Sequence, residues 1–163
     1  MTLNQYTAYF AAIAAAHLQI GAARFTSMGI EEILSGLRTS LDTVDGFALL
    51  LETPEGRIEA ANNDSFRDVW RGAFQIVRAV RPDDFPQALL YMSEAKEIGM
   101  QIVARMFDDR KNGVLKGFDP ASVEYMDIMR EYDNAHGYRF EFSIWSRPVG
   151  CLEIDNAVWN DKP

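Results

Sequence analysis

The clearest hydrophobic pattern in the chain lies in residues 137–147, where apolar and polar residues alternate. The apolar positions are Tyr138, Phe140, Phe142 and Ile144. The polar positions between them are Arg139, Glu141 and Ser143. A period of two is typical of a strand with one buried face. Because the chain begins with helical periodicity instead, this strand indicates a mixed α and β class.

The first 45 residues have the spacing of two amphipathic helices. Thr2 and Gln5 match a capping box, which predicts a helix that begins at Leu3, and Gly21 predicts its end. A second, shorter helix is predicted to begin near Ser27. The apolar stripe of the first helix is Leu3, Tyr6, Phe10, Ile13, Ala14, His17 and Ile20. The apolar stripe of the second helix is Ile30, Ile33, Leu34, Leu37 and Leu41.

Three strands are predicted to follow, at residues 47–52, 57–61 and 66–80. Pro54 and Gly56 stand at the second and fourth positions of a type I turn, which predicts a hairpin between the first two strands. Residues 62–65 have loop chemistry. Gly72 predicts a bulge that bends the third strand.

The longest helix is predicted at residues 85–109, with Pro86 in its first turn, where the missing N–H is harmless. A final hairpin joins strands at 123–131 and 138–145 across a loop at 133–137. The apolar stripe of the long helix is Leu89, Met92, Ala95, Gly99, Ile102 and Met106.

The predicted order of elements is therefore α-α-β-β-β-α-β-β. It indicates an α+β fold in which residues 1–148 form a single domain, with two N-terminal helices and a mainly antiparallel sheet of about five strands. The long helix packs on this sheet. Residues 149–163 form a C-terminal arm that lacks periodicity but retains Leu152, Ile154, Val158 and Trp159. Because exposing such side chains risks aggregation, we expect the arm to dock, either on its own domain or on a neighbouring subunit.

Composition and charge exclude several classes of protein. The chain has 163 residues and a formal charge of −8, which argues against direct binding of nucleic acid. Its single cysteine, Cys151, excludes an internal disulfide and suits a reducing cytoplasm. No Lys or Arg precedes the apolar residues 11–16, so no signal peptide is expected. That apolar run is also too short to span a membrane. We therefore expect a cytoplasmic protein.

One segment, residues 108–119, partly matches a calcium-binding loop. The match includes Asp108 and Gly113, but Arg110 and Lys116 stand where oxygen ligands belong. Asp119 is also too short to replace the usual bidentate Glu. The simpler interpretation is a charged helix end followed by a glycine turn, and no metal is expected.

No pattern of catalytic residues is present. His17 is expected to be a hydrogen-bonded core residue, and His136 an exposed residue of the last hairpin loop. Phosphate-binding loops, dinucleotide fingerprints and Gly-x-Ser-x-Gly are absent from the sequence. The carboxylate pairs are typical of a solvated surface: Glu31-Glu32, Asp83-Asp84 and Asp108-Asp109. The sequence therefore predicts a protein that is not an enzyme, with no catalytic residue and no cofactor.

The candidate site residues belong to protein interfaces. Trp70 and Arg71 are of the types enriched in binding hot spots. The alternative for Trp70 is a half-exposed strand residue covered by arginine stems. Trp159 is the third candidate, because burial of a side chain of this size stabilises a contact by roughly 2–3 kcal/mol.

In element order the chain resembles the small proteins that complete the tails of bacteriophages and prophages. The resemblance is carried by the N-terminal helices, the strands of 47–80, the helix of 85–109 and the closing Gly-Tyr-Arg-Phe-Glu-Phe strand. It implies a non-enzymatic structural protein that self-associates or binds a ring partner, in the cytoplasm or in a virion. Two alternatives stay open. One is an acidic adaptor, inhibitor or immunity-like protein that binds one basic partner. The other is a small ligand-binding protein with an apolar cavity beneath its sheet.

Overall fold

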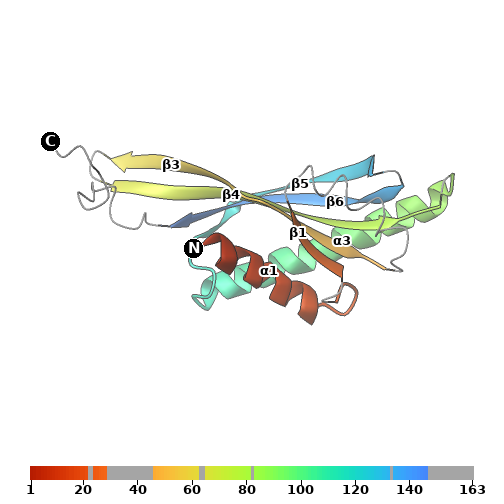
Figure 1. Cartoon of the computed structure of the whole chain (residues 1–163), viewed down its shortest axis with the longest axis horizontal. Helices are drawn as coiled ribbons and strands as arrows, with labels where there is room; N and C mark the ends of the chain where they lie inside the picture. The colour runs from red at the N-terminus through yellow and green to blue at the C-terminus, as the bar shows by residue number, and fades with distance from the viewer. Residues whose placement is uncertain (22–23, 29–45, 63–64, 82, 133, 147–163) are drawn as a thin grey trace, which may run out of the picture.

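The computed structural model describes residues 1–163 except 22–23, 29–45, 63–64, 82, 133 and 147–163. In the described part of the chain, two helices lie on one face of a six-stranded sheet (Figure 1). The elements in chain order are α1 (Leu3–Ala16), β1 (Phe25–Met28), β2 (Ala48–Glu52), β3 (Glu55–Asn62), β4 (Ser65–Ala79), α3 (Phe85–Lys111), β5 (Phe118–Tyr132) and β6 (Ala135–Ser146). The prediction of an α+β fold is confirmed.

Both described helices begin where the sequence predicts, at Leu3 and Phe85. The Thr2 hydroxyl accepts a hydrogen bond from the Gln5 backbone N–H, and the Gln5 side chain accepts one from the Thr2 N–H. Asp84 caps α3 by accepting from the Gln87 N–H, and a proline stands in the first turn. The predicted end of α1 at Gly21 is wrong, because the helix ends at Ala16 with His17 as its C-cap.

The strand order is β1-β2-β4-β6-β5, and β3 also pairs with β4. All pairs are antiparallel except β1 with β2. The central strands β4 and β6 pair continuously from Asp68–Ser146 to Ala79–Ala135. This long continuous pairing of β4 with β6 forms the middle of the sheet.

The main core fills the space between the helices and the sheet. Aromatic rings dominate it, and Phe74 stacks on Phe140 with ring centroids 5.1 Å apart. Two members of the predicted helical stripes lie outside this core, since Leu3 is 48% exposed and Leu89 63% exposed. The predicted stripes are wrong at these two positions, and the first buried residues of the helices are Tyr6 and Ala88. The largest fully buried side chains include Tyr6, Phe10, Phe74, Phe118, Phe140 and Phe142.

Two predictions for the N-terminal half are wrong. Ser27 lies in β1, which pairs in parallel with β2, so no helix begins there. The rest of the predicted second helix lies outside the described residues. The hairpin at Pro54 does not form either, because β2 and β3 both pair with β4, one after the other along its length. Proline has no N–H, and Pro54 therefore interrupts the ladder without reversing the chain.

Gly72 does not form the predicted bulge. The register between β4 and β6 runs through the Gly72–Phe142 pair without a shift. A Cβ at this position would lie 2.6 Å from the Tyr6 hydroxyl and 2.9 Å from the Phe142 ring. Glycine is therefore required here because α1 approaches the sheet closely.

Candidate protein-interaction site

The most distinctive feature of the fold is a two-stranded arm, which we define as β3 together with residues 65–71 of β4. Figure 1 shows that the arm extends past the end of α1, away from the helix layer. Residues 65–67 of β4 pair with β3 but lie beyond the residues that pair with β6. Among the described residues, β4 is the only strand partner of β3. The arm therefore presents a free strand edge.

The two faces of the arm differ in chemistry. The Gly56–Trp70 pair lies on the helix side of the sheet, since Trp70 also pairs with the core residue Ile144. By strand alternation the Ile58–Asp68 pair lies on the same side, where Ile58 is 56% exposed and the Asp68 carboxylate accepts a hydrogen bond from Trp70. The Ala60–Phe66 pair follows on this side, with Ala60 exposed and Phe66 half-buried. The opposite face is mainly polar, with one buried apolar residue, Val69. Its polar residues are Glu55, Arg57, Glu59, Arg67 and Arg71.

The base of the arm is fixed by the first of the predicted interface residues. The Trp70 ring packs edge-on against Tyr6, with centroids 6.3 Å apart, and its Nε1 donates to both carboxylate oxygens of Asp68 at 3.0–3.1 Å. Trp70 is only half-buried. Its position is compatible with both interpretations of Trp70, as an interface residue and as a half-exposed strand residue. The ring packs on the core and borders the exposed side of the arm.

Arg71 lies on the polar face and belongs to a charged cluster, which we define as Glu52, Arg71, Gln75, Arg139 and Glu141. The Arg139 guanidinium donates to both oxygens of Glu52, at 2.6 and 2.7 Å, and also to Glu141. Arg71 donates to Glu141, and Gln75 donates to Glu52 at 2.7 Å. Glu52 and Glu141 are both buried. Each carboxylate is thus held between positively charged or amide donors.

The electrostatics of this cluster do not suit acid–base chemistry. Burial acts to raise the pKa of Glu141, but hydrogen bonds from Arg139 and Arg71 outweigh it, and the pKa lies below its ordinary value. The hydrogen bond to Glu52 raises the pKa of Arg139. Both groups are therefore fixed in their charged forms. A general acid or base needs a pKa near the working pH, so we assign the cluster to the structure of the sheet.

The edge of the sheet opposite the arm is β5. Two of its side chains are prominent there, because Tyr125 is 47% exposed and Met126 is 48% exposed. Tyr125 packs against Phe140 on the helix side, with ring centroids 5.7 Å apart. The Lys96 ammonium lies 4.8 Å from the centre of the Tyr125 ring. The molecule therefore presents partly apolar strands on two opposite edges.

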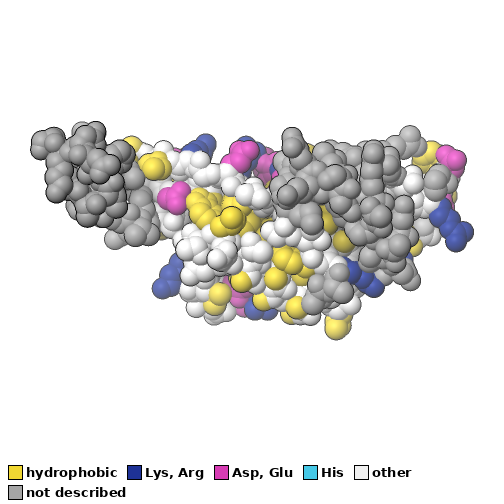
Figure 2. Space-filling view, viewed as in Figure 1, with side chains coloured by type: hydrophobic (Ala, Val, Ile, Leu, Met, Phe, Trp, Pro, Cys, Tyr) yellow, Lys and Arg dark blue, Asp and Glu magenta, His cyan; other side chains and the backbone are white. Residues whose placement is uncertain are grey.

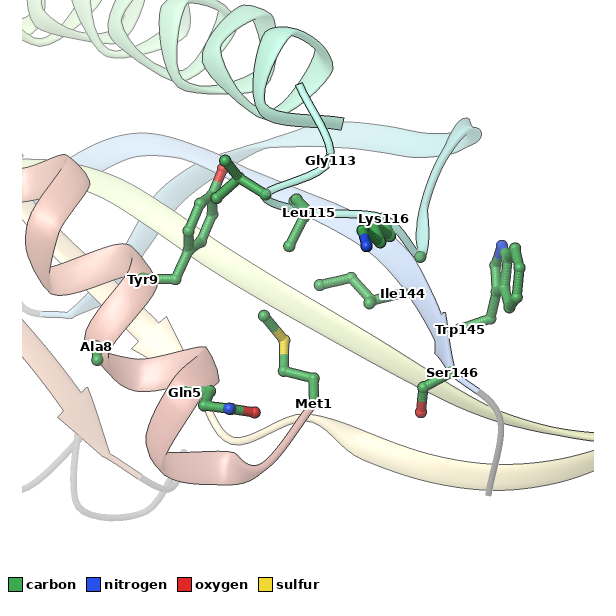
Figure 3. A pocket seen from close by; sticks show the side chains of 12 residues that line it. Met1, Gln5, Ala8, Tyr9, Gly113, Leu115, Lys116, Ile144, Trp145 and Ser146 are labelled. Atoms are coloured by element: carbon green, nitrogen blue, oxygen red, sulfur yellow. The ribbon is translucent and has the colours of Figure 1, made fainter. Parts of the chain in front are cut away.

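An apolar groove of about 860 Å³ opens on the helix side, between the start of α1, residues 113–117 and the end of β6. Figure 3 shows Met1, Tyr9, Leu115 and Ile144 around the same space, with Trp145 at one rim. Hydrophobic side chains also gather beside the start of α1 in the space-filling view (Figure 2). The groove lies beneath the sheet, where a ligand-binding protein would be expected to have its cavity.

An ion pair between the exposed Arg105 and the buried Asp109 supports the wall of this groove. The Tyr9 hydroxyl donates to the Asp109 carboxylate at 2.9 Å, and Arg105 Nε donates to both oxygens at 2.9–3.0 Å. Burial, together with the bond to Asp109, raises the pKa of Tyr9. Asp109 is only 5% exposed. Tyr9, Arg105 and Asp109 thus join α1 to α3, and their polar groups are hydrogen-bonded to one another.

The remaining predicted candidates do not form a site. His17 is half-buried at the end of α1, where its Nε2 lies 3.1 Å from Gln101 Oε1, so it is hydrogen-bonded but is not a core residue. His136 lies within β6 and is half-buried, because the last hairpin loop is shorter than predicted. Asp108 accepts from the Asn112 side chain at the end of α3. Cys151 and Trp159 lie outside the described residues.

Within the parts of the chain that the structure describes, no three His, Cys, Asp or Glu side chains are placed to hold a metal ion. No helix in those parts is both long and apolar enough to cross a membrane. The arm, the charged cluster and the groove were all missed by sequence reasoning. Each is assembled from segments that are far apart in the chain, although the exposed apolar Ile58 within a charged strand was a local signal for the arm.

No family model matches the chain, and no curated protein matches it at a significant level.

Proposed function

We propose that the protein is a non-enzymatic structural component that assembles with copies of itself through the β3/β4 arm. The observation that carries this proposal is the largely apolar side of the arm, on which Ile58 is 56% exposed opposite Asp68. The arm itself extends past the end of α1 (Figure 1). A sheet face of this kind is normally buried against another layer. A free strand edge beside it adds unpaired backbone donors and acceptors, which favour pairing with another chain.

A second copy fits because the two free edges lie on opposite sides of the sheet. The arm is at one side and β5 at the other, so the arm of one subunit meets the β5 edge of the next. Contacts between different surfaces repeat head to tail and generate a ring when the rotation closes. Tyr125 and Met126 supply apolar side chains on the receiving edge.

The order of elements supports a more specific class, the tail-completion proteins of bacteriophages and prophages, which form rings or caps. In that class a component is found in the cytoplasm before assembly and in the virion after it. The formal charge of −8 supports a partner that is protein and not nucleic acid. The pairing of both buried carboxylates of the charged cluster with arginine supports the absence of acid–base catalysis, and no part of the proposal requires a cofactor.

The test is the effect of Ile58→Asp on self-association, measured by light scattering and sedimentation across a dilution series. We expect the wild-type chain to associate as its concentration rises, and Ile58→Asp to remain monomeric because it places a charge in the apolar contact. Leu89→Asp is the matched control. Leu89 is similarly exposed, at 63% against 56%, but lies on α3 and should not alter association.

Equal association of wild type and Ile58→Asp would refute the role of the arm. A wild-type chain that stays monomeric at every concentration would refute self-association and favour the acidic adaptor. Retention of one basic protein partner by that monomer would then support the adaptor directly. Saturable binding of a small apolar probe in the groove would support the ligand-binding alternative.

A further inference from the structure

The apolar groove beneath the sheet is not used by the proposed assembly contact. Its lining includes Val114, which is 65% exposed, and Trp145, which is 40% exposed. A volume of about 860 Å³ with a mainly apolar lining and few polar groups is typical of a site that binds another group. We therefore expect another group to bind in the groove, and the shape and charge of the groove restrict the chemistry of that group.

The charge of the groove favours an acidic occupant. Lys116 is the only charged side chain among the described residues that line it, and Figure 3 shows Lys116 beside Ile144. The last 15 residues of the chain have the complementary composition. They contain three acidic residues and one lysine, interleaved with apolar side chains: Leu152, Ile154, Val158 and Trp159.

The position of this segment in the chain also favours it. β6 ends at Ser146, which itself lines the groove. The six residues 147–152 can span up to ~20 Å, so the apolar side chains from Leu152 onward are within reach of the groove. A short tether of this kind gives an effective concentration on the order of 1 mM, which exceeds that of any other copy in dilute solution.

We propose that residues 149–163 bind in the apolar groove of their own chain, with Leu152, Ile154 and Trp159 against its walls and the acidic side chains near Lys116. These residues lie outside the described residues, and only their sequence enters the proposal. The contact is independent of the arm, since self-association by Ile58 requires neither Val114 nor Trp159. Failure of one proposal leaves the other standing.

The single cysteine of the chain, Cys151, provides the test in the full-length protein. Val114→Cys adds a second thiol on the groove, and a short bifunctional maleimide then joins the two thiols when they are close. We expect rapid formation of a cross-linked monomer, at a rate that does not change with protein concentration as long as the chain stays monomeric. Mass spectrometry identifies the joined peptides, and denaturing gels separate a monomer from a dimer.

The matched control is Leu89→Cys, which places an equally exposed thiol about 33 Å from the C-terminal end of α3 at ~1.5 Å per residue. Cross-linking at Leu89→Cys should be at least several-fold slower. Adding Trp159→Ala or Lys116→Glu to Val114→Cys should slow the reaction, since each removes one part of the contact.

Equal rates for Val114→Cys and Leu89→Cys would overturn the proposal, because they would show that Cys151 lies no nearer to the groove than to a site about 33 Å from its end of α3. A product that is mainly a cross-linked dimer would also overturn it, and would assign the groove to the segment of a second copy. Rates that are unaffected by both Trp159→Ala and Lys116→Glu would contradict the apolar and charge complementarity on which the choice of occupant rests.

Discussion

Gly99 is the position where the packing of α3 on the sheet can be tested most sharply. It lies inside α3, and a Cβ built on it would lie 2.0 and 2.2 Å from two ring carbons of Phe140. In an exposed helix interior, Gly→Ala would stabilise the fold by about 1 kcal/mol, because alanine has the higher helix propensity. The structure predicts the opposite sign.

The reason is that the Phe140 ring has little room to move. It is fully buried and stacks on Phe74, with the two ring planes 8° apart. Forcing extra volume into such a core costs roughly 1–3 kcal/mol. After the gain in helix propensity is subtracted, we expect Gly99→Ala to lower the free energy of unfolding by up to about 2 kcal/mol. In a chain of this size, each 1 kcal/mol corresponds to about 2–4 °C in Tm.

The assay is urea unfolding followed by circular dichroism, with a double-mutant cycle between Gly99→Ala and Phe140→Leu. Phe140→Leu alone should destabilise the core, but the double variant should lose less than the sum of the two, because the smaller side chain accommodates the new methyl group. The exposed variant Ala104→Gly serves as the propensity control. A Gly99→Ala protein that is more stable than wild type would refute the close contact between α3 and β6.

Two further predictions concern the buried ionisable groups. Tyr9→Phe removes the hydroxyl that donates to buried Asp109 and should lower the free energy of unfolding by roughly 1.5–3 kcal/mol, while the more exposed Tyr125→Phe should change it little. Because the pKa of Tyr9 is raised on folding, its contribution is present below pH 10 and is lost as the pH rises above that value. Thermal unfolding at alkaline pH should therefore depend less on pH in Tyr9→Phe, and an unchanged pH dependence would contradict the Asp109 contact. The pKa of Glu141 is lowered from 4.5, so its contribution is present above that pH and is lost as the pH falls through the folded value. Acid titration of Glu141→Gln should show a shallower loss of stability below pH 4.5 than wild type, and identical slopes would contradict the charged cluster.

Elements with strong local periodicity could be predicted from the sequence. The capping box of α1, the whole of α3 and the central strand β4 follow from spacing and from capping residues that act within four positions. β1 could not be predicted in this way. It has four residues, and its parallel partner β2 begins about twenty positions later, so no local pattern indicates the pairing.

The candidate sites were harder to predict because they depend on strand register. Glu52, Arg71 and Arg139 come from three different strands and meet only because β2, β4 and β6 are aligned as they are. A shift of one residue would move each side chain to the other face. The groove similarly joins α1, residues 113–117 and the end of β6, and none of these segments has a distinctive composition of its own.

The arm and the groove meet at one residue, which gives a physical route between the two proposed contacts. The Arg67 guanidinium of the arm lies over the Trp145 ring, 5.1 Å from its centre, and Trp145 stands at the rim of the groove. A subunit that binds the arm contacts the strand that carries Arg67, while an occupant of the groove contacts Trp145. If binding at one contact moves this pair, it changes the free energy of binding at the other contact. Binding at the second contact then changes the free energy of binding at the first by the same amount, because coupling between two binding sites is reciprocal. The cross-linking rate at Val114→Cys, measured above and below the concentration at which the chain associates, therefore reports the sign of that coupling.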